Sequence, residues 1–120
     1  MKYRNKKVKF EGIIFDSKKE ANRYQGLKND LKNGLISNLI LQPEFPLLPS
    51  FKDIRTGTTK KGDALVVRGV KYIADFQYQK DGQIIVEDVK SKITAKEPLF
   101  KLKWKLLLWK YKDIQFKIIV

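Results

Sequence analysis

The sequence predicts a single α/β domain over residues 1–120, in which helices flank a mixed central β-sheet. Three observations predict this fold class. The chain has 120 residues, the length of one ordinary domain, and no interdomain linker interrupts it. Apolar residues make up 42% of it, which is enough for one core. Alternating and helical apolar patterns follow one another in the order strand, helix, strands, helix, strand, which is typical of helices packed on a sheet.

The first part of the chain predicts a tight turn and then a helix. Residues 6–16 (KKVKFEGIIFD) read as short extended pieces around a turn at Glu11-Gly12. The helix covers residues 17–34 (SKKEANRYQGLKNDLKNG), where Ser17 can cap the first turn and Gly34 can end the last. Glu20 stands three residues after Ser17, which is the spacing of a capping box. The expected apolar stripe is Ala21, Tyr24, Leu27 or Lys28, and Leu31.

The middle of the chain predicts extended structure followed by a polar loop. Residues 36–48 (ISNLILQPEFPLL) are expected to be extended, and the nearby prolines confine them to an edge or a broken strand. Residues 50–63 (SFKDIRTGTTKKGD) are rich in Gly, Thr and Lys, which favours a mobile loop. Its cations are Lys52, Arg55, Lys60 and Lys61.

The last part of the chain predicts strands, a second helix and a final strand. Residues 64–79 and 83–90 read as strands, and residues 113–120 (DIQFKIIV) alternate as a strand should. The helix is expected in residues 94–112, with Thr94 and Glu97 as a capping box and Pro98 in the first turn. Its apolar side is expected to hold Phe100, Trp104, Leu107, Leu108 and Tyr111.

The absence of cysteine and histidine restricts the chemistry that the protein can perform. Without cysteine there are no disulfides, zinc–thiolate sites or thiol nucleophiles. Without histidine there are no Ser-His-Asp systems and no His-ligated zinc sites. Acid–base or metal chemistry must therefore use Asp, Glu, Lys or Tyr. Carboxylate sites of this kind favour hard cations such as Mg²⁺ or Mn²⁺.

The charge of the chain predicts a polyanionic partner. Lys and Arg total 26 against 13 Asp and Glu, which gives a net charge of +13, and the pI is near 9.9. Nucleic acid is the simplest such partner, although solvated lysines on a soluble protein or a basic membrane-surface protein would have the same composition. No apolar run reaches membrane length and residues 1–7 do not begin a signal peptide, so we expect a cytoplasmic protein with no membrane partner.

An Asp-Gly pair sets the register of the most distinct hairpin in the sequence. Asp81-Gly82 is a strong signal for a two-residue type I′ turn, whose central residues both need positive φ. Lys80 then pairs with Gln83. Continuing that register places Asp75 opposite Asp88, and like charges facing each other on adjacent strands repel.

The same register adds a lysine to the two carboxylates. Ile73 would face Lys90 and Phe76 would face Glu87. Because side chains alternate along a strand, Lys90 shares the face of Asp88, whereas Glu87 points away. A divalent cation would remove the repulsion between Asp75 and Asp88, and Lys90 could neutralise one of them. The alternative is a solvent-facing strand surface with a local salt bridge.

These residues suit phosphodiester hydrolysis. That reaction needs a cation on the scissile phosphate, an oriented water and a stabilised leaving oxygen. Asp75 and Asp88 could hold Mg²⁺ while leaving coordination positions for water and phosphate, and Lys90 could position the water. Glu20 is the candidate third carboxylate. Its spacing from Ser17 also fits an ordinary capping box, so both roles stay open.

The chain resembles the PD-(D/E)XK nuclease superfamily. The motifs are YIADF (residues 72–76) and VEDVKS (residues 86–91), which supply Asp75 and then Asp88-Val89-Lys90. Together with FDSKKEANRY, LQPEF and the terminal DIQFKIIV, they resemble a small phage-encoded family linked to Holliday junction resolvases. Ala74 stands where the superfamily name has proline.

This resemblance implies a restriction-endonuclease-like core and a Mg²⁺-dependent DNA endonuclease, in which Mn²⁺ can substitute. It implies that Glu20, Asp75, Asp88 and Lys90 are catalytic and that the three carboxylates bind the metal. It further implies a homodimer that acts on four-way or other branched DNA in the cytoplasm of a host bacterial cell. The alternatives are a nuclease of this fold with another DNA substrate, or a non-catalytic basic module that binds nucleic acid through a degenerate site.

Five lysines are the candidate DNA contacts. Lys101 and Lys105 stand one turn apart on the second helix, and Lys92 closely follows the motif. Lys60 and Lys61 lie in the polar segment, which could clamp a strand or a branch. Contacts of this type fix position rather than sequence. A solvated helix face is the alternative for the helical lysines.

Overall fold

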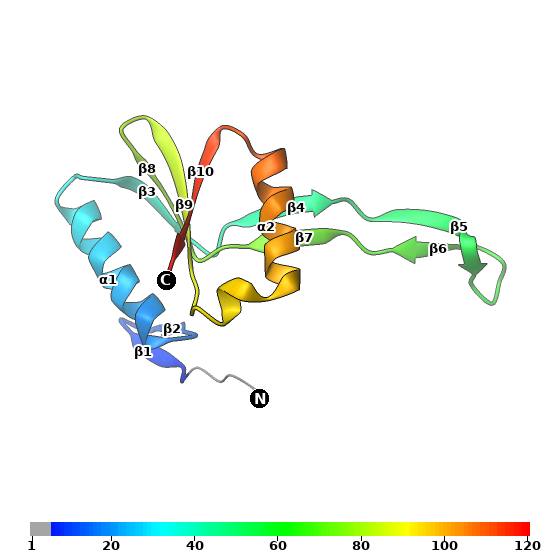
Figure 1. The fold of residues 1–120 in the computed structure, drawn as a ribbon, viewed down its shortest axis with the longest axis horizontal. Helices are drawn as coiled ribbons and strands as arrows, with labels where there is room; N and C mark the ends of the chain where they lie inside the picture. Colours follow the sequence, from blue (N-terminus) through cyan, green and yellow to red (C-terminus); the bar gives the residue numbers. More distant parts are fainter. Residues whose placement is uncertain (1–5) are drawn as a thin grey trace.

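A four-stranded sheet lies at the centre of the computed structural model, which describes residues 6–120 (Figure 1). Its strands, in spatial order, are β10 (Ile114–Ile119), β9 (Gln83–Val89), β8 (Phe76–Lys80) and β3 (Ser37–Leu41). β9 runs parallel to β10 and antiparallel to β8, and β3 is antiparallel to β8. The protein is therefore one small domain of mixed α/β content, as the sequence predicts.

The first helix, α1 (Lys18–Lys32), covers one face of this sheet (Figure 1). The Ser17 Oγ accepts a hydrogen bond from the backbone N–H of Glu20 at 3.1 Å, which confirms the predicted cap. Tyr24 stacks on Phe76, with 6.3 Å between the ring centroids. The core on this face contains Phe15, Ala21, Tyr24, Leu27, Ile36, Phe76, Tyr78 and Ile85. Leu31, the last residue of the predicted stripe, lies at the edge and is partly exposed.

The second helix, α2 (Pro98–Lys110), covers the opposite face. The core there contains Phe45, Tyr72, Ala74, Val86, Phe100 and Leu107. Pro98 begins the helix as predicted. The predicted packing of Leu108 is wrong, because nearly half of this side chain is exposed. Apolar residues of α2 occur on every side of the helix, but only one side can face the sheet, so some of them stay exposed.

The start of α2 also differs from the prediction. Thr94 does not form a capping box with Glu97; it begins a separate 3-10 turn, η1 (Thr94–Lys96). The Thr94 N–H donates to Ser91 Oγ at 3.0 Å, and Ile93 is the N-cap of this turn. Glu97 is the N-cap of α2 and makes no side-chain capping bond. The Ser91 hydroxyl thus accepts from the Thr94 N–H, which is the donor that the Glu97 side chain would have bound in the predicted capping box.

The predicted mobile loop at residues 50–63 is wrong. Most of it belongs to a two-stranded hairpin of β5 (Phe51–Thr58) and β6 (Ala64–Val67), which projects from the body of the protein (Figure 1). Phe51 pairs with Val67, and Asp53 pairs with Leu65. Polar composition is typical of loops, but the pairing of β5 with β6, the next strand along the chain, overrides it here. We call this hairpin the arm.

The remaining strands connect the arm to the central sheet. β4 (Glu44–Leu48) pairs antiparallel with β7 (Val70–Ile73), and the predicted strand of residues 64–79 is thus divided among β6, β7 and β8. Gly69 marks one break, where a Cβ atom would lie 2.6 Å from the carbonyl oxygen of Leu48. At the other end of the chain, β1 (Val8–Phe10) and β2 (Ile13–Phe15) form the predicted hairpin around Glu11-Gly12.

Neither of the two helices in residues 6–120 is long and apolar enough to cross a membrane.

Candidate functional site

The β8–β9 hairpin has the register that its turn predicts. Asp81 and Gly82 have φ values of 51° and 77°, as a type I′ turn requires. Lys80 pairs with Gln83, and the ladder continues to Phe76 opposite Glu87. The register predicted from the sequence is thus confirmed for β8 and β9, from Phe76 to Lys80.

The register changes beyond Phe76, at Asp75. The Asp75 N–H donates to the carbonyl oxygen of Glu87 at 3.2 Å, and Asp75 Oδ2 accepts from the N–H of Val89 at 2.7 Å. Asp75 thus lies outside the β8 ladder and binds the two residues that flank Asp88. The expected direct pairing of Asp75 with Asp88 is replaced by these contacts with the residues on either side of Asp88.

The predicted pairing of Ile73 with Lys90 is wrong. Ile73 pairs with Glu44 in the β4–β7 ladder, and the Lys90 N–H donates to the carbonyl oxygen of Ile119 at 2.8 Å. At Ala74 the chain passes from the β4–β7 sheet into the central sheet. Lys90 keeps its predicted neighbour Asp88 because the two residues are on one strand end.

Glu87 points to the opposite face, as strand alternation predicts. It is 1% exposed and forms a double ion pair with Arg23 of α1, with both N···O distances at 2.6 Å. The Tyr78 hydroxyl also donates to it. Burial alone would raise the pKa of Glu87, but these hydrogen bonds more than offset burial and lower the pKa. Glu87 is therefore a structural ion-pair partner that ties α1 to the sheet.

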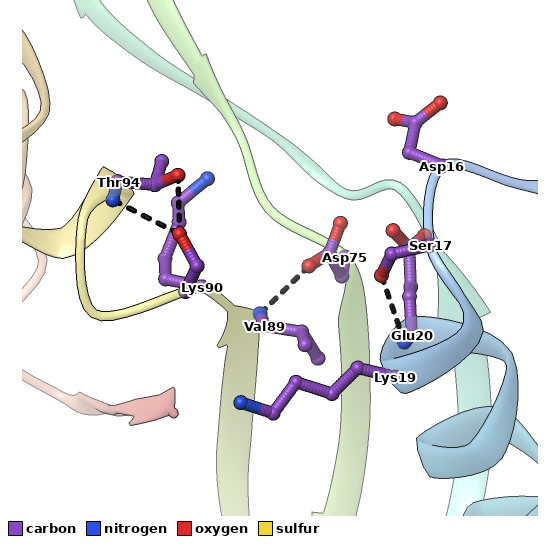
Figure 2. A pocket seen from close by; sticks show the side chains of 9 residues that line it. Asp16, Ser17, Lys19, Glu20, Asp75, Val89, Lys90 and Thr94 are labelled. Carbon is purple, nitrogen blue, oxygen red and sulfur yellow. Dashed lines mark hydrogen bonds between the residues drawn. The ribbon is translucent and has the colours of Figure 1, made fainter. Parts of the chain in front are cut away.

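A cavity of about 230 Å³ lies between the start of α1 and the end of β9 (Figure 2). Glu20 enters it from α1, Asp75 from the β7–β8 connection and Lys90 from the end of β9. Three of the four predicted catalytic residues thus line one cavity, which we call the carboxylate pocket.

Asp88 does not line the carboxylate pocket. Its side chain is 1% exposed and contacts Lys90, whose Nζ lies 3.3 Å from Oδ2. Within residues 6–120 that oxygen has no hydrogen-bond partner. Lys90 also lies over the ring of Phe100, 5.2 Å from its centroid. Lys90 therefore separates Asp88 from the open part of the cavity.

The three predicted metal-ligating carboxylates all have raised pKa values. Burial, followed by the charges of Asp75, Asp16 and Asp88, raises the pKa of Glu20 to about 7. Burial raises the pKa of Asp88 to about 6, although Lys90 acts in the opposite direction. Burial also raises the pKa of Asp75 against the opposing hydrogen bond from Val89. Burial is thus the largest cause of the raised pKa at each of the three carboxylates, and Lys90 opposes it at each.

The donor set fits a hard cation in chemistry but only partly in placement. Carboxylate oxygens are the ligands that Mg²⁺ prefers, and Lys90 is a cation that acts on all three carboxylates. Within residues 6–120, no group of three carboxylates is placed to hold one ion as the side chains stand. Glu20 and Asp75 line the cavity. To bind an ion together with them, Asp88 would have to give up its contact with Lys90.

The sequence interpretation missed several residues of the carboxylate pocket. Asp16 and Lys19 line it near Glu20, and Thr94 lines it near Lys90 (Figure 2). Ser91 also lines it. Asp16 matters most, because its charge raises the pKa values of Glu20 and Asp75. The sequence does contain a signal for Asp16. It stands directly before the helix cap Ser17, and this position lies near the first turn of α1, where Glu20 is.

The five candidate DNA-binding lysines are all exposed but lie in different places. Lys92 closely follows the carboxylate pocket, and Lys101 and Lys105 lie on α2. Lys60 and Lys61 lie in the turn at the tip of the arm, far from the pocket (Figure 1). One surface patch therefore does not hold all five.

The two tryptophans of α2 have different surroundings. Trp104 packs in the core, 5.5 Å from Phe100 and 5.8 Å from Phe116 between ring centroids. Trp109 is 71% exposed and belongs to no core. The expected place of Trp104 on the apolar side of the second helix is thus confirmed.

Comparisons with known proteins give one match. No curated protein and no solved structure matches the chain. A family described as "Protein of unknown function (DUF1064)" matches residues 1–120. The chain belongs to that family.

Proposed function

We propose that this protein is a metal-dependent DNA endonuclease of the PD-(D/E)XK type that cleaves branched DNA such as Holliday junctions. The observation that carries the proposal is the carboxylate pocket, where Glu20 and Asp75 meet Lys90 beside the buried Asp88. The net charge of +13 supports a nucleic-acid substrate.

The arrangement of elements supports a restriction-endonuclease-like core. The β8–β9 hairpin is followed by α2 and by β10, which returns parallel to β9. Asp75 stands just before β8, and Asp88 and Lys90 stand at the end of β9. Glu20 reaches the same cavity from the first turn of α1. This order of elements and motif residues supports the resemblance to the superfamily.

Glu20, Asp75 and Asp88 are the residues that would hold Mg²⁺, and Mn²⁺ could substitute for it. A bound ion of this kind polarises the scissile phosphate and lowers the pKa of a bound water. The Lys90 ammonium would orient the attacking water and offset the negative charge that develops on the phosphate. Asp75 is already held in place by its hydrogen bond from Val89. Lys92, Lys101 and Lys105 would hold the flanking phosphates.

A homodimer is part of the proposal, because a junction has two equivalent strands to cut. The candidate surface is a stripe of exposed apolar residues on α2 formed by Leu102, Leu106 and Trp109, which we call the α2 stripe. Helical spacing places these three residues on one side of α2. An exposed apolar stripe of this kind is typical of an interaction surface. We further propose that the protein acts in the cytoplasm of a host bacterial cell.

A second candidate function is a non-catalytic DNA-binding module. One observation favours it: within residues 6–120 no three carboxylates are placed to share an ion. In that case the lysines would bind nucleic acid and the raised pKa of Glu20 would reflect only an unused acidic pocket.

A cleavage assay tests the proposal. A four-way junction, a linear duplex and a single strand are each incubated with the protein in Mg²⁺, Mn²⁺ or EDTA. We expect junction cleavage in either metal, none in EDTA, and a loss of at least about a hundredfold in rate for Asp88→Ala, because the variant loses a metal ligand. Asp113→Asn, which removes an exposed carboxylate at a distance, is the matched control and should retain activity.

Two results would contradict the proposal. DNA binding without cleavage in both metals would leave the non-catalytic module. Cleavage of the linear duplex as fast as the junction would instead leave a nuclease of this fold with a different substrate.

A further inference from the structure

We infer that a second cavity, adjacent to the carboxylate pocket, binds an unstacked nucleobase of the DNA strand that is cut. This inference rests on the proposed function for the identity of the strand, but the cavity itself is a feature of the fold. It has a volume of about 310 Å³ and shares Lys90 and Thr94 with the carboxylate pocket. A strand lying across Lys90 would therefore reach both cavities.

The walls of this cavity suit a flat ring. Tyr72 and Phe100 contribute aromatic surface, with 6.3 Å between their centroids and 44° between their planes. Ile73 and Leu99 add aliphatic surface that is 48% and 64% exposed. Exposed apolar groups beside aromatic rings are typical of sites that stack the face of a base.

The Tyr72 hydroxyl supplies the polar contact that such a ligand needs. Tyr72 is 6% exposed, and within residues 6–120 its hydroxyl oxygen is buried with no hydrogen-bond partner. Buried hydroxyl groups without a partner are uncommon in folded proteins. The edge of a nucleobase carries both donors and acceptors, so a base that enters deeply enough to reach this hydroxyl would give it its missing partner.

Charged groups at the cavity fit a nucleotide rather than an apolar molecule. Lys71 and Lys103 line it and can contact the phosphates on either side of the base, and Lys71 now pairs with Glu44 at 2.6 Å. Glu97 also lines the cavity and can accept from the exocyclic amino group of a base.

A paired base in a duplex stacks on both sides and cannot enter a cavity of this kind. Bases at a branch point or in a single strand are already partly unstacked, so they pay less to leave the helix. The second cavity would therefore select a strand that is locally open next to the cut. Structure selectivity would then arise beside the scissile phosphate, without reading of sequence.

The inference is tested by binding in EDTA, which needs no cleavage. The Trp109→Phe protein leaves Trp104 as the fluorophore, and Trp104 lies 6.0 Å from Tyr72 and 5.5 Å from Phe100 between ring centroids. Short oligothymidylate is titrated against an abasic strand of equal length and charge. We expect the strand with bases to quench Trp104 and to bind about tenfold more tightly.

Variants locate the effect in the cavity. Leu99→Ala should remove most of the preference for bases over abasic sites, whereas Leu108→Ala, an exposed leucine of α2 outside the cavity, should retain it. Tyr72→Phe should retain the quenching but weaken binding of the strand with bases, with the melting temperature unchanged or higher. Circular dichroism checks that each variant is folded.

The outcomes separate this inference from the proposed function. Equal affinity for strands with and without bases, or equal effects of Leu99→Ala and Leu108→Ala, would overturn the inference even if the wild type cuts junctions. A base preference that depends on Leu99, in a protein that cuts no DNA in Mg²⁺ or Mn²⁺, would support the nucleobase cavity and overturn the nuclease.

Discussion

The Nζ of Lys90 lies 3.3 Å from Oδ2 of Asp88, an oxygen that has no hydrogen-bond partner within residues 6–120. The pair is built on one strand end, and its carboxylate is almost completely buried. An acid that is buried with one lysine neighbour and a raised pKa is held there at a cost in stability. The free energy of unfolding of variants at these residues should therefore test whether the site is kept for function and not for stability.

Removing the charge of Asp88 should stabilise the metal-free protein. At pH 8 the Asp88→Asn variant should have a free energy of unfolding about 1 kcal/mol higher than the wild type, because a neutral amide avoids burying a charge. The same variant should lose cleavage. Urea denaturation in EDTA measures the first effect, with Asp113→Asn as the unchanged control. A less stable Asp88→Asn protein at pH 8 would mean that the ion pair stabilises the fold.

Glu20 should make stability depend on pH. Its pKa is raised to about 7 in the folded protein from an ordinary value of 4.5, so the folded state holds the proton more tightly. Stability contributed by the protonated form is present at low pH and is lost as the pH rises from about 4.5 through about 7. In EDTA, melting temperatures between pH 4.5 and 8.5 should therefore decline less for Glu20→Gln than for the wild type.

The same variant separates the two roles proposed for Glu20. The cap uses the backbone N–H of Glu20, so Glu20→Gln retains it. If Glu20 is a ligand, cleavage should fall strongly, and Mg²⁺ should raise the melting temperature more at pH 8 than at pH 5.5 in the wild type but not in the variant. Unchanged cleavage with a lower melting temperature would leave Glu20 with a structural role only.

Glu87, next to Asp88 in sequence, should behave in the opposite way. Arg23→Ala would leave the Glu87 carboxylate buried without its cation, and it should lower the free energy of unfolding by about 3 kcal/mol. The lowered pKa of Glu87 means that its contribution to stability is present above its ordinary pKa and is lost as the pH falls. Calorimetry between pH 3 and 7 should detect this loss in the wild type and not in Glu87→Gln. At a temperature where the Arg23→Ala variant is still folded, it should cleave DNA, because neither Arg23 nor Glu87 belongs to the proposed catalytic residues.

The α2 stripe should give self-association that increases with salt. Lys101 and Lys105 lie on the same helix as Leu102, Leu106 and Trp109, and α2 has no acidic residue. Two copies that meet at the stripe would bring like charges together, and salt screens that repulsion. Sedimentation should show more dimer at 0.5 M than at 0.05 M NaCl, and Leu102→Glu should remain a monomer at both. DNA binding should weaken over the same range.

The parts of the fold that local chemistry determines could be predicted from the sequence. The Asp81-Gly82 turn alone fixed the β8–β9 register, because only residues tolerant of positive φ form a type I′ turn. Ser17 and Gly34 likewise determined the limits of α1 within two residues. Strand alternation correctly separated Asp88 from Glu87.

Features that depend on distant contacts could not be predicted. Nothing near Ala74 indicates that the chain leaves one sheet for another, because the partner of Ile73 is Glu44, far earlier in the sequence. The strand character of residues 51–58 depends on pairing with Ala64–Val67, which is close in sequence but which their polar composition does not indicate. The depth at which Asp88 is buried follows from the packing of α2, which the alternation of β9 does not reveal.

The arm has a consequence for local opening of the protein. A ribbon of two strands has two unpaired edges and no second layer to cover it, whereas β9 has a partner on each side and a helix on each face. Amide protons of β5 and β6 should therefore exchange with solvent through small fluctuations, while those of β9 wait for global unfolding. Hydrogen–deuterium exchange would measure the difference directly. The arm can thus change shape on a partner without disturbing the sheet that holds the carboxylates.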